Sequence, residues 1–424
     1  MRNNMLSKAI APFLLMLAMF GYGDDDLKRL GDLLRPYAAQ DYWQTQPAPP
    51  PLTRTVLVRS IEAARAYYLN QQKSDGSFIY GKDMASDEVY EDDNQVRQAG
   101  ALWGLASLNR DRGNEPTRRG VILGLDFFAR CMTVLPTGES TVVYPGEENI
   151  KTGTVALYCL SLIEFLRGQG ISLPKEVKDR YQTYLDLNIT YLQSMEMPDG
   201  SWARSYDAPS GFRETIASPY YDGEALLAYC KAARYLGRTD LLPRIEYALP
   251  RLLAKYTVVC WRPGGDTKLT KGFYQWGCMA SAEYLEAGWT THADLAADAA
   301  LAMSWWLLYD NQLEYRQGNT AYAVEGLVGA WRVAKVRKDT KSMAVLQETA
   351  ERITNQLITL QYGGPYQDFN PLLKSLRRVQ PESFGGISAS RDSAVVRIDV
   401  QQHQTHAMLM ILNCFFTETP ADSK

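Results

Sequence analysis

Several carboxylates stand at points of the chain where they could do chemistry together. Asp92 and Asp93 directly precede a segment with helical periodicity, while Glu224 and Glu325 lie inside two others, among apolar residues. Hydrolysis of a glycosidic bond needs one protonated carboxyl beside the leaving oxygen and a second carboxylate that activates water or attacks the sugar. With Asp93 as base or nucleophile and Glu224 or Glu325 as acid, these four residues are the predicted catalytic set.

A second set of side chains suits proton transfer beside a sugar carboxylate, which is the chemistry of uronate lyases and C5-epimerases. That reaction requires a cation to neutralise the carboxylate and a Tyr, His or Lys to move the proton. It stays open beside hydrolysis, and aromatic faces would suit a sugar ring in either case. The residues predicted to bind the substrate are Arg97, Tyr144, Arg213, Tyr220, Tyr221, Tyr274, Trp276, Asn319, Tyr322, Arg397 and His403.

The acidic residues also have an ordinary structural explanation. Asp92, Asp222 and Asp399 could cap helices or complement a helix dipole, a contribution of about 0.5–2 kcal/mol. Glu224 and Glu325 lie deeper, where an unpaired carboxylate is costly. Ion pairs with arginines would account for them equally well.

Two histidines near the C-terminus raise the question of a metal site. The spacing of Asp399, His403 and His406 places them on one helix face, as metal ligands often are. A further ligand is not evident, because the only other histidine, His292, belongs to a segment predicted to lie on the outside. We therefore expect histidines that hydrogen-bond to their neighbours, and neither a metal ion nor another cofactor.

The elements that must position these residues are helices. A period of 3.6 residues dominates after residue 53, and strand alternation is scarce. Twelve helices are predicted, at 54–72, 93–110, 117–132, 151–168, 175–196, 219–236, 239–256, 273–288, 291–309, 319–336, 339–361 and 399–416.

The connections between these segments alternate in length. Those after the odd-numbered segments are long, and those after the even-numbered segments are short, which demands antiparallel neighbours. The sequence therefore predicts an all-α fold, an (α/α)6 toroid of six helical hairpins over residues 54–418. The even-numbered helices would form an inner ring, with their starts and the long loops at one mouth. Loops on a rigid scaffold commonly carry function.

A weak internal repeat supports this architecture. The stretch from Asp75 to Phe78 recurs from Asp199 to Trp202, each time as Asp-Gly-Ser followed by an aromatic residue after an outer helix. The turn resembles the helix-ending Q-x-x-x-G-x-W motif of terpene cyclases and other six-hairpin toroid proteins, polysaccharide-modifying enzymes among them. The resemblance covers the architecture of nearly the whole chain and implies no particular chemistry.

The tandem Asp92-Asp93 resembles the Asp-Asp motif of the endo-α-mannanase-type toroid glycosidases, in which the pair is catalytic. The match extends to the downstream residues 103–106, Trp-Gly-Leu-Ala, and Arg97 departs from the pattern. The resemblance implies a catalytic role for Asp92 and Asp93. Lanthionine cyclases, protein prenyltransferases and terpene cyclases require motifs that this chain lacks.

The N-terminal sequence and the net charge indicate where the protein is located and which partners it can bind. Arg2 and Lys8 precede an apolar run over 9–20, which at about 18 Å is shorter than the roughly 30 Å membrane core. Residues 1–23 are therefore predicted to be an export signal or anchor, followed by a Pro-rich lead-in over 24–53. The expected location is periplasmic or extracellular, with membrane contact only through an uncleaved N-terminus. A net charge of −3 offers no basic field for nucleic acid.

The expected partner is an oligo- or polysaccharide, and the arginines favour an acidic one. A hydrolase acting through paired carboxylates leads among the predicted functions, and a lyase or epimerase is the alternative. A non-catalytic glycan-binding or assembly protein of an envelope pathway is the rival of another class.

Overall fold

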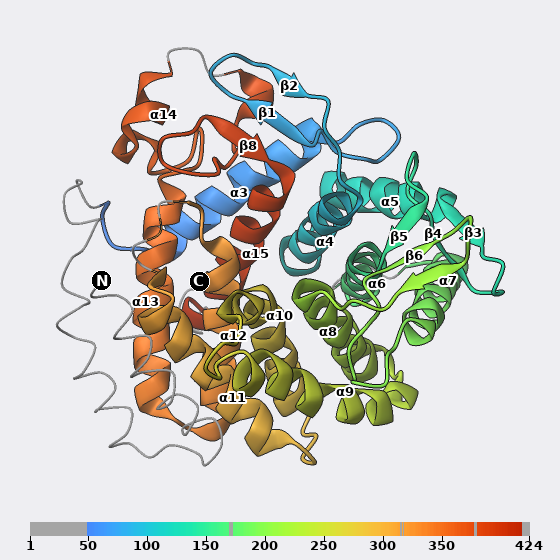
Figure 1. Ribbon diagram of the computed structural model, residues 1–424. Helices are drawn as coiled ribbons and strands as arrows, with labels where there is room; N and C mark the ends of the chain where they lie inside the picture. The colour runs from blue at the N-terminus through green and yellow to red at the C-terminus, as the bar shows by residue number, and fades with distance from the viewer. Residues whose placement is uncertain (1–48, 169–172, 314–315, 317, 377–379, 418–424) are drawn as a thin grey trace.

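The computed structural model describes residues 49–168, 173–313, 316, 318–376 and 380–417. Six inner helices form a closed ring in which each packs against the next and the last returns to the first, as Figure 1 shows along the ring axis. The ring runs through α4 (Gln95–Arg112), α6 (Thr152–Leu166), α8 (Pro219–Leu236), α10 (Thr267–Glu286), α12 (Ala321–Arg337) and α15 (Ile398–Phe415).

Six outer helices lie around this ring and alternate with the inner helices along the chain. They are α3 (Arg54–Gln71), α5 (Glu115–Arg130), α7 (Lys175–Ser194), α9 (Leu242–Ala254), α11 (Ala293–Trp305) and α13 (Thr340–Ile358). Two of them, α9 and α11, continue into π-helical turns, Lys255–Val259 and Trp306–Asp310. The predicted (α/α)6 toroid is confirmed, because both the alternation and the closed ring are present.

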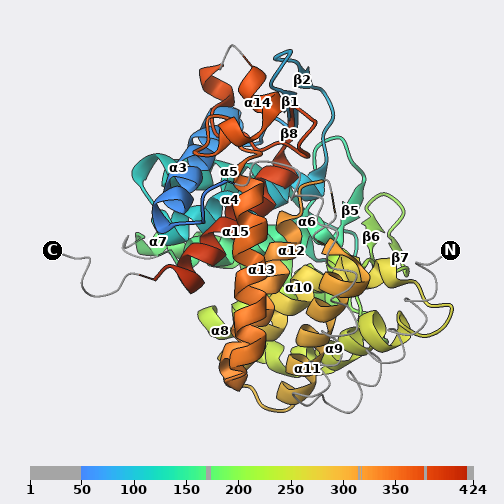
Figure 2. The same ribbon diagram turned by 90° about the vertical axis from the view of Figure 1, so that its left-hand side faces the viewer.

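The long connections contain short strands that lie on one face of the toroid. In Figure 2, β5, β6 and β7 lie on the side opposite the C-terminal end of α15. All the pairings are antiparallel. The sheets have the orders β2-β1-β8, β3-β4 and β5-β6-β7. Their strands are β1 (Gly81–Asp83), β2 (Val89–Tyr90), β3 (Met132–Val134), β4 (Ser140–Val142), β5 (Asn149–Lys151), β6 (Ser205–Asp207), β7 (Phe212–Glu214) and β8 (Val395–Arg397).

Strand pairing also closes the toroid. β1 belongs to the first long connection and β8 to the last, and their pairing brings the two connections together beside the starts of α4 and α15. The last connection also holds the short helix α14 (Pro371–Ser375) and the 3-10 turns Gln367–Phe369 and Pro381–Ser383. A third 3-10 turn, Thr239–Leu241, precedes α9.

The repeated Asp-Gly-Ser turn serves to fasten outer helices to inner ones. Asp75 and Asp199 each accept the backbone N–H of the serine two residues later. The aromatic residue that follows gives its backbone N–H to an inner helix: Phe78 to Gln98 on α4, and Trp202 to Asp222 on α8. The resemblance to toroid turns therefore has a structural meaning here.

Helix boundaries lie within four residues of the predicted ones except at the start of α10. This helix begins at Thr267, capped by the side chain of Asp266, rather than at residue 273, so it carries Lys271 into the ring. No helix within the described ranges is long and apolar enough to cross a membrane. The predicted export signal and lead-in lie almost wholly outside the described residues.

Candidate functional site

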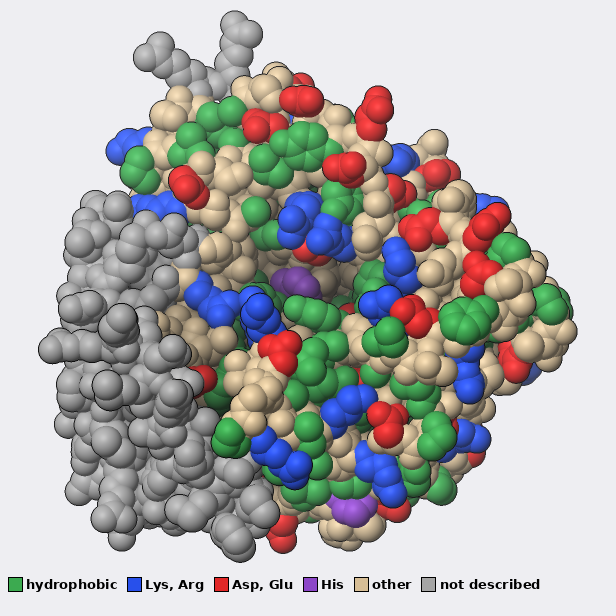
Figure 3. All heavy atoms as spheres, in the orientation of Figure 1, with side chains coloured by type: hydrophobic (Ala, Val, Ile, Leu, Met, Phe, Trp, Pro, Cys, Tyr) green, Lys and Arg blue, Asp and Glu red, His purple; other side chains and the backbone are tan. Residues whose placement is uncertain are grey.

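A cavity of about 460 Å³ opens among the starts of the inner helices. In the orientation of Figure 1, Figure 3 shows a hollow in the middle of this face, with a histidine side chain at its floor and Lys and Arg side chains around it. We call this the mouth cavity. It is lined by Asn94, Val96, Arg97, Tyr220, Tyr221, Glu224, Lys271, Gln275, Trp276, Asn319, Tyr322, Arg397, Asp399, Val400 and His403.

A histidine at the floor of the mouth cavity is held by a buried carboxylate. His403 Nδ1 lies 2.8 Å from Glu325 Oε2, and His406 Nδ1 lies 2.7 Å from Glu325 Oε1. The side chain of Glu325 is completely buried, whereas that of His403 keeps 23% of its surface exposed. Because Nδ1 is engaged by the carboxylate, the Nε2 of His403 is left to act on the contents of the cavity.

The shared carboxylate shifts the protonation of its partners. Burial by itself would raise the pKa of Glu325, but the charges and hydrogen bonds of His403 and His406 hold it below its usual value. Burial would lower the pKa of His403, but the charge of Glu325 and its hydrogen bond outweigh burial and raise it. Glu325 is therefore an ionised support for the histidine rather than a proton donor.

Glu224 has the opposite environment. It is 3% exposed, and its Oε2 has no hydrogen-bond partner in the described structure. Burial raises the pKa of Glu224 well above its usual range, because a buried site disfavours the charged form of a carboxyl. A Cβ on Gly153 of α6 would come within 2.6 Å of Glu224 Oε2, so only glycine leaves room for this carboxyl.

Basic residues surround one carboxylate on the wall formed by α4 and α15. Arg397 donates to both oxygens of Asp399, at 2.6 and 2.8 Å, and Arg97 lies 3.5 Å from the same carboxylate. Arg97 also bonds to the hydroxyl of Tyr80. Burial opposes ionisation of Asp399, but both arginines lower its pKa below the usual value. Two cations thus share one ionised carboxylate.

A further pair of cations meets at Tyr322. Lys271 Nζ lies 5.5 Å from the centre of the Tyr322 ring, and Arg316 donates to the Tyr322 hydroxyl at 3.2 Å. Neither forms an ion pair with a carboxylate of the described residues. Burial, together with Arg316, lowers the pKa of Lys271. The mouth cavity therefore carries an excess of positive charge.

Aromatic rings form the floor beside His403. Trp276 packs 6.2 Å from the His403 ring and 5.3 Å from Trp103, whose ring in turn lies 4.4 Å from His406. Asn319 is held by its own contacts, because its Nδ2 donates to Gln404 at 2.7 Å. Its side chain is therefore fixed at the edge of the cavity.

Asp92 and Asp93 lie elsewhere than predicted, because neither lines the mouth cavity. Asp93 accepts the backbone N–H of Asn94 and the side-chain amide of Gln98, both at 2.8 Å, and the hydroxyl of Tyr144 at 2.6 Å. Asn94, rather than either aspartate, caps α4. Asp93 and Tyr144 thus fasten a loop to the helix start, and Asp92 is exposed.

Two more predicted residues point away from the cavity. Tyr274 is fully buried, since its ring packs against Gly326 of α12 and its hydroxyl lies 3.3 Å from Ser304 of α11. Arg213 lies on β7 and donates to the backbone of Ser194 at 2.6 Å. The predicted residues that do line the mouth cavity are Arg97, Tyr220, Tyr221, Glu224, Trp276, Asn319, Tyr322, Arg397 and His403.

Four polar residues that line this site are absent from the predicted set: Asn94, Lys271, Gln275 and Asp399. Lys271 was assigned to a loop, although Asp266 was a detectable helix cap before it. Asp399 was read only as a cap or a metal ligand. Gln275 donates to Glu325 at 3.3 Å. This contact joins two different helices, so no local sequence pattern predicts it. The described residues contain no group of three or more His, Cys, Asp or Glu placed to hold a metal ion.

No protein-family model matches the chain, and no curated protein matches it by sequence. Solved structures do match. The structure of a D-mannose isomerase aligns with a TM-score of 0.60 and 11% identity, over 85% of this chain and 98% of that one. An unsaturated glucuronyl hydrolase specific for heparin aligns with a TM-score of 0.55 and 10% identity, over 86% and 99%.

A third match is a family 76 α-mannanase of Bacteroides thetaiotaomicron, with a TM-score of 0.51 and 10% identity over 84% of this chain and 95% of that one. These neighbours are carbohydrate-active toroid enzymes, as the predicted resemblance implied. At such low identity the likeness establishes the fold that they share with this chain.

Proposed function

We propose that this protein is a sugar-active enzyme that moves a proton at a carbon beside a carboxylate or carbonyl group. His403 is the base and Glu224 is the acid. The observation that carries this proposal is that one cavity holds both a histidine backed by a buried carboxylate, His403 with Glu325, and a buried carboxyl, Glu224, whose Oε2 has no hydrogen-bond partner among the described residues. Pairs of groups whose pKa values are pushed apart mark acid and base roles.

The reaction follows from these two groups. His403 Nε2 takes the proton from the sugar carbon, and the charge that develops on the adjacent oxygens is stabilised by the cations of the cavity. Glu224 then supplies a proton: to the opposite face of the same carbon in an epimerase, to the neighbouring carbon of the enediol in an isomerase, or to the leaving oxygen in a lyase. Structural likeness to a sugar isomerase agrees with this class but by itself shows only the fold.

Charge supports an acidic substrate. Lys271 and Arg316 have no carboxylate partner among the described residues, and Arg97 and Arg397 share a single one. A carboxylate on the sugar would neutralise this excess. The tyrosines and Trp276 that line the same cavity supply faces for a sugar ring. The export signal predicted at the N-terminus makes an envelope or extracellular glycan the first class to test.

Hydrolysis is the second candidate, and one observation favours it. Glu224 has a raised pKa and Asp399 a lowered one, and both line the cavity, as a glycosidase acid and base would. Two arginines bind Asp399, however, and these bonds make it a weaker base than His403. The pair predicted from the sequence, Asp93 with Glu224 or Glu325, does not meet in this cavity.

A single incubation separates these candidates. Uronate-containing and neutral oligosaccharides are incubated with the enzyme in D₂O and followed by proton NMR and ultraviolet absorbance. Deuterium at a sugar carbon without chain cleavage indicates an epimerase or isomerase, and an unsaturated product indicates a lyase. New reducing ends without either signal would show a hydrolase. Binding without any turnover would show the non-catalytic glycan-binding protein and overturn the proposal.

A further inference from the structure

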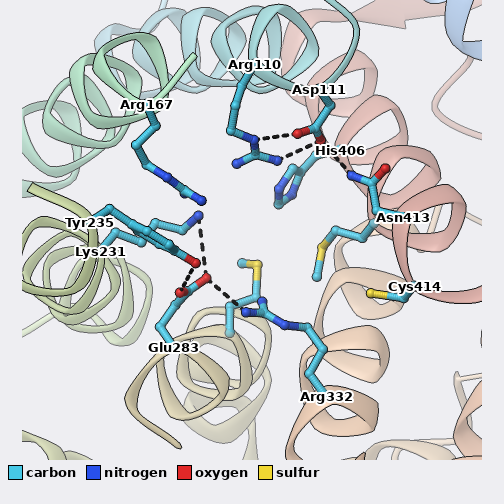
Figure 4. Close-up of a pocket in the computed structure, with 12 residues that line it drawn as sticks. Arg110, Asp111, Arg167, Lys231, Tyr235, Glu283, Arg332, His406, Asn413 and Cys414 are labelled. Atoms are coloured by element: carbon cyan, nitrogen blue, oxygen red, sulfur yellow. Dashed lines mark hydrogen bonds and ion pairs between the residues drawn. The ribbon is translucent and has the colours of Figure 1, made fainter. Parts of the chain in front are cut away.

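A second cavity, of about 720 Å³, lies at the other end of the toroid axis among the C-terminal halves of the inner helices. We call it the rear cavity, and Figure 4 shows its side chains converging from the surrounding helices. It is lined by Arg110, Asp111, Arg167, Lys231, Tyr235, Met279, Glu283, Arg332, His406, Met410, Asn413 and Cys414. Apart from His406, the proposed reaction uses none of these residues or their ion-pair partners.

One buried carboxylate holds three of the cations. Glu164 is fully buried, and its Oε1 accepts from Lys231 at 2.5 Å while its Oε2 accepts from Arg167 at 3.1 Å and from Arg110. Burial would raise the pKa of Glu164, but these three cations hold it well below the usual value. The single carboxylate of Glu164 is thus paired with three cations.

The other carboxylates of this region are already engaged. Asp111 binds Arg110, whereas Glu283 and Glu286 bind both Arg234 and Arg332. Lys231 reaches Glu283 only at 3.7 Å. The described residues of the cluster therefore hold one more cation than carboxylates. Part of this charge offsets the partial negative charge of the helix C-termini, but Arg167 and Lys231 project toward the middle of the cavity (Figure 4).

Arg167 is placed as a ligand-binding arginine would be. Its guanidinium carbon lies 3.2 Å from the centre of the Tyr235 ring, which fixes the plane of the group. Only one of its nitrogens bonds to Glu164, and its other N–H groups have no partner among the described residues. Beside it, the side chain of Lys231 is 7% exposed. An oxyanion could accept from both at once.

We infer that the rear cavity binds a small organic anion, whose phosphate or carboxylate group is held by Arg167 and Lys231. The cavity is larger than the mouth cavity, and Met279 and Met410 give it an apolar wall for the carbon part of such a molecule. His406 lines this cavity and shares Glu325 with His403. A ligand in contact with His406 would therefore act on the same carboxylate that supports the proposed base.

Isothermal titration calorimetry of the full chain with inorganic phosphate, and separately with citrate, tests this inference. The wild type is expected to bind one anion per chain. Arg167→Gln keeps a side chain over Tyr235 but removes the charge, and it should weaken binding at least tenfold. Arg119→Gln, an exposed position on the outer helix α5, should leave the affinity unchanged. The relative affinities of phosphate and citrate show which oxyanion the site prefers.

Two further variants locate the site. Lys271→Gln removes an unpaired cation of the mouth cavity and should leave the stoichiometric binding intact. Met410→Glu places a carboxylate within the rear cavity and should abolish that binding while circular dichroism and thermal unfolding confirm the fold. The inference is overturned if neither anion binds at millimolar concentration, if Lys271→Gln rather than Arg167→Gln removes binding, or if a folded Met410→Glu protein binds as tightly as the wild type.

Discussion

The Nδ1 of His403 on α15 lies 2.8 Å from the Oε2 of Glu325 on α12, a carboxylate that is completely buried. This contact joins two inner helices and leaves the other ring nitrogen of His403 to the mouth cavity. It also fixes the orientation of the ring, which is what a general base needs before it can take a proton from carbon. The expected effects of replacing His403, Glu325 and Glu224 follow from this contact and from the Oε2 of Glu224, which has no hydrogen-bond partner among the described residues.

Replacing His403 should abolish most turnover. A positioned acid–base group contributes typically about 10²- to 10⁴-fold to a rate, so His403→Gln is expected to lower kcat by at least about 100-fold while binding of the sugar persists. The matched control is His292→Gln, which alters the histidine at the N-cap position of the outer helix α11, where its side chain makes no capping hydrogen bond. Steady-state rates of both variants check this, and equal activities would remove His403 from the mechanism.

Glu325→Gln should shift the pH dependence of the rate. In the wild type Glu325 raises the pKa of His403, so kcat/KM should rise with pH as the histidine loses its proton. Without the negative partner the pKa of His403 falls, and the rise should move to lower pH. The maximal rate should also fall, since the ring is no longer held in one orientation. An unshifted profile in a folded variant would contradict the support role.

Glu224→Gln should lower activity and at the same time reduce the loss of stability at high pH. The variant loses the proton donor, so kcat should fall by at least about 100-fold. Burial raises the pKa of Glu224, so the wild type loses stability as pH rises above the carboxyl's ordinary value, toward the raised one. The glutamine variant should escape that loss. Glu348→Gln, at an exposed site on α13, is the control, and urea unfolding at several pH values gives the measurement.

Asp93→Asn should affect the fold more than the reaction. Asp93 accepts from Asn94, Gln98 and Tyr144, and loss of one or two of these bonds should cost about 1–2 kcal/mol of unfolding free energy. Turnover should stay within a few-fold of the wild type. Asp92→Asn, at an exposed position, should change neither quantity. Loss of turnover with full stability would restore the catalytic role implied by the Asp-Asp resemblance.

Asp222→Asn should flatten the pH dependence of stability. Burial raises the pKa of Asp222 to about 7, although the N–H of Trp202 and the hydroxyl of Tyr256 oppose the shift. Between about pH 4 and pH 7 the unfolded chain therefore releases a proton that the folded chain keeps, and stability falls as pH rises. The total is at most about 4 kcal/mol. Denaturant unfolding from pH 4 to 8 should show a smaller slope in the variant.

The fold was largely predictable because its signals are local. A 3.6-residue period and an alternation of short and long connections are enough to require antiparallel hairpins, and six of them close into a ring. The start of α10 was missed by six residues, since a cap such as Asp266 is weaker evidence than an apolar stripe. Short strands such as β1 and β8 were not foreseen, because their pairing joins segments that lie near opposite ends of the chain.

The sequence by itself determined which helix starts meet at the mouth, and it placed Glu224, His403 and Arg397 there. Only the tertiary structure decided which side chains face the cavity and in which protonation state. Helical spacing relates residues along one helix but leaves open how that helix is rotated against its neighbours. In the structure Asp93 accepts a hydrogen bond from Tyr144, and the ring of Tyr274 packs against Gly326, so neither faces the cavity. Charge is equally non-local, since burial and partners on other helices set the ionisation of each acid.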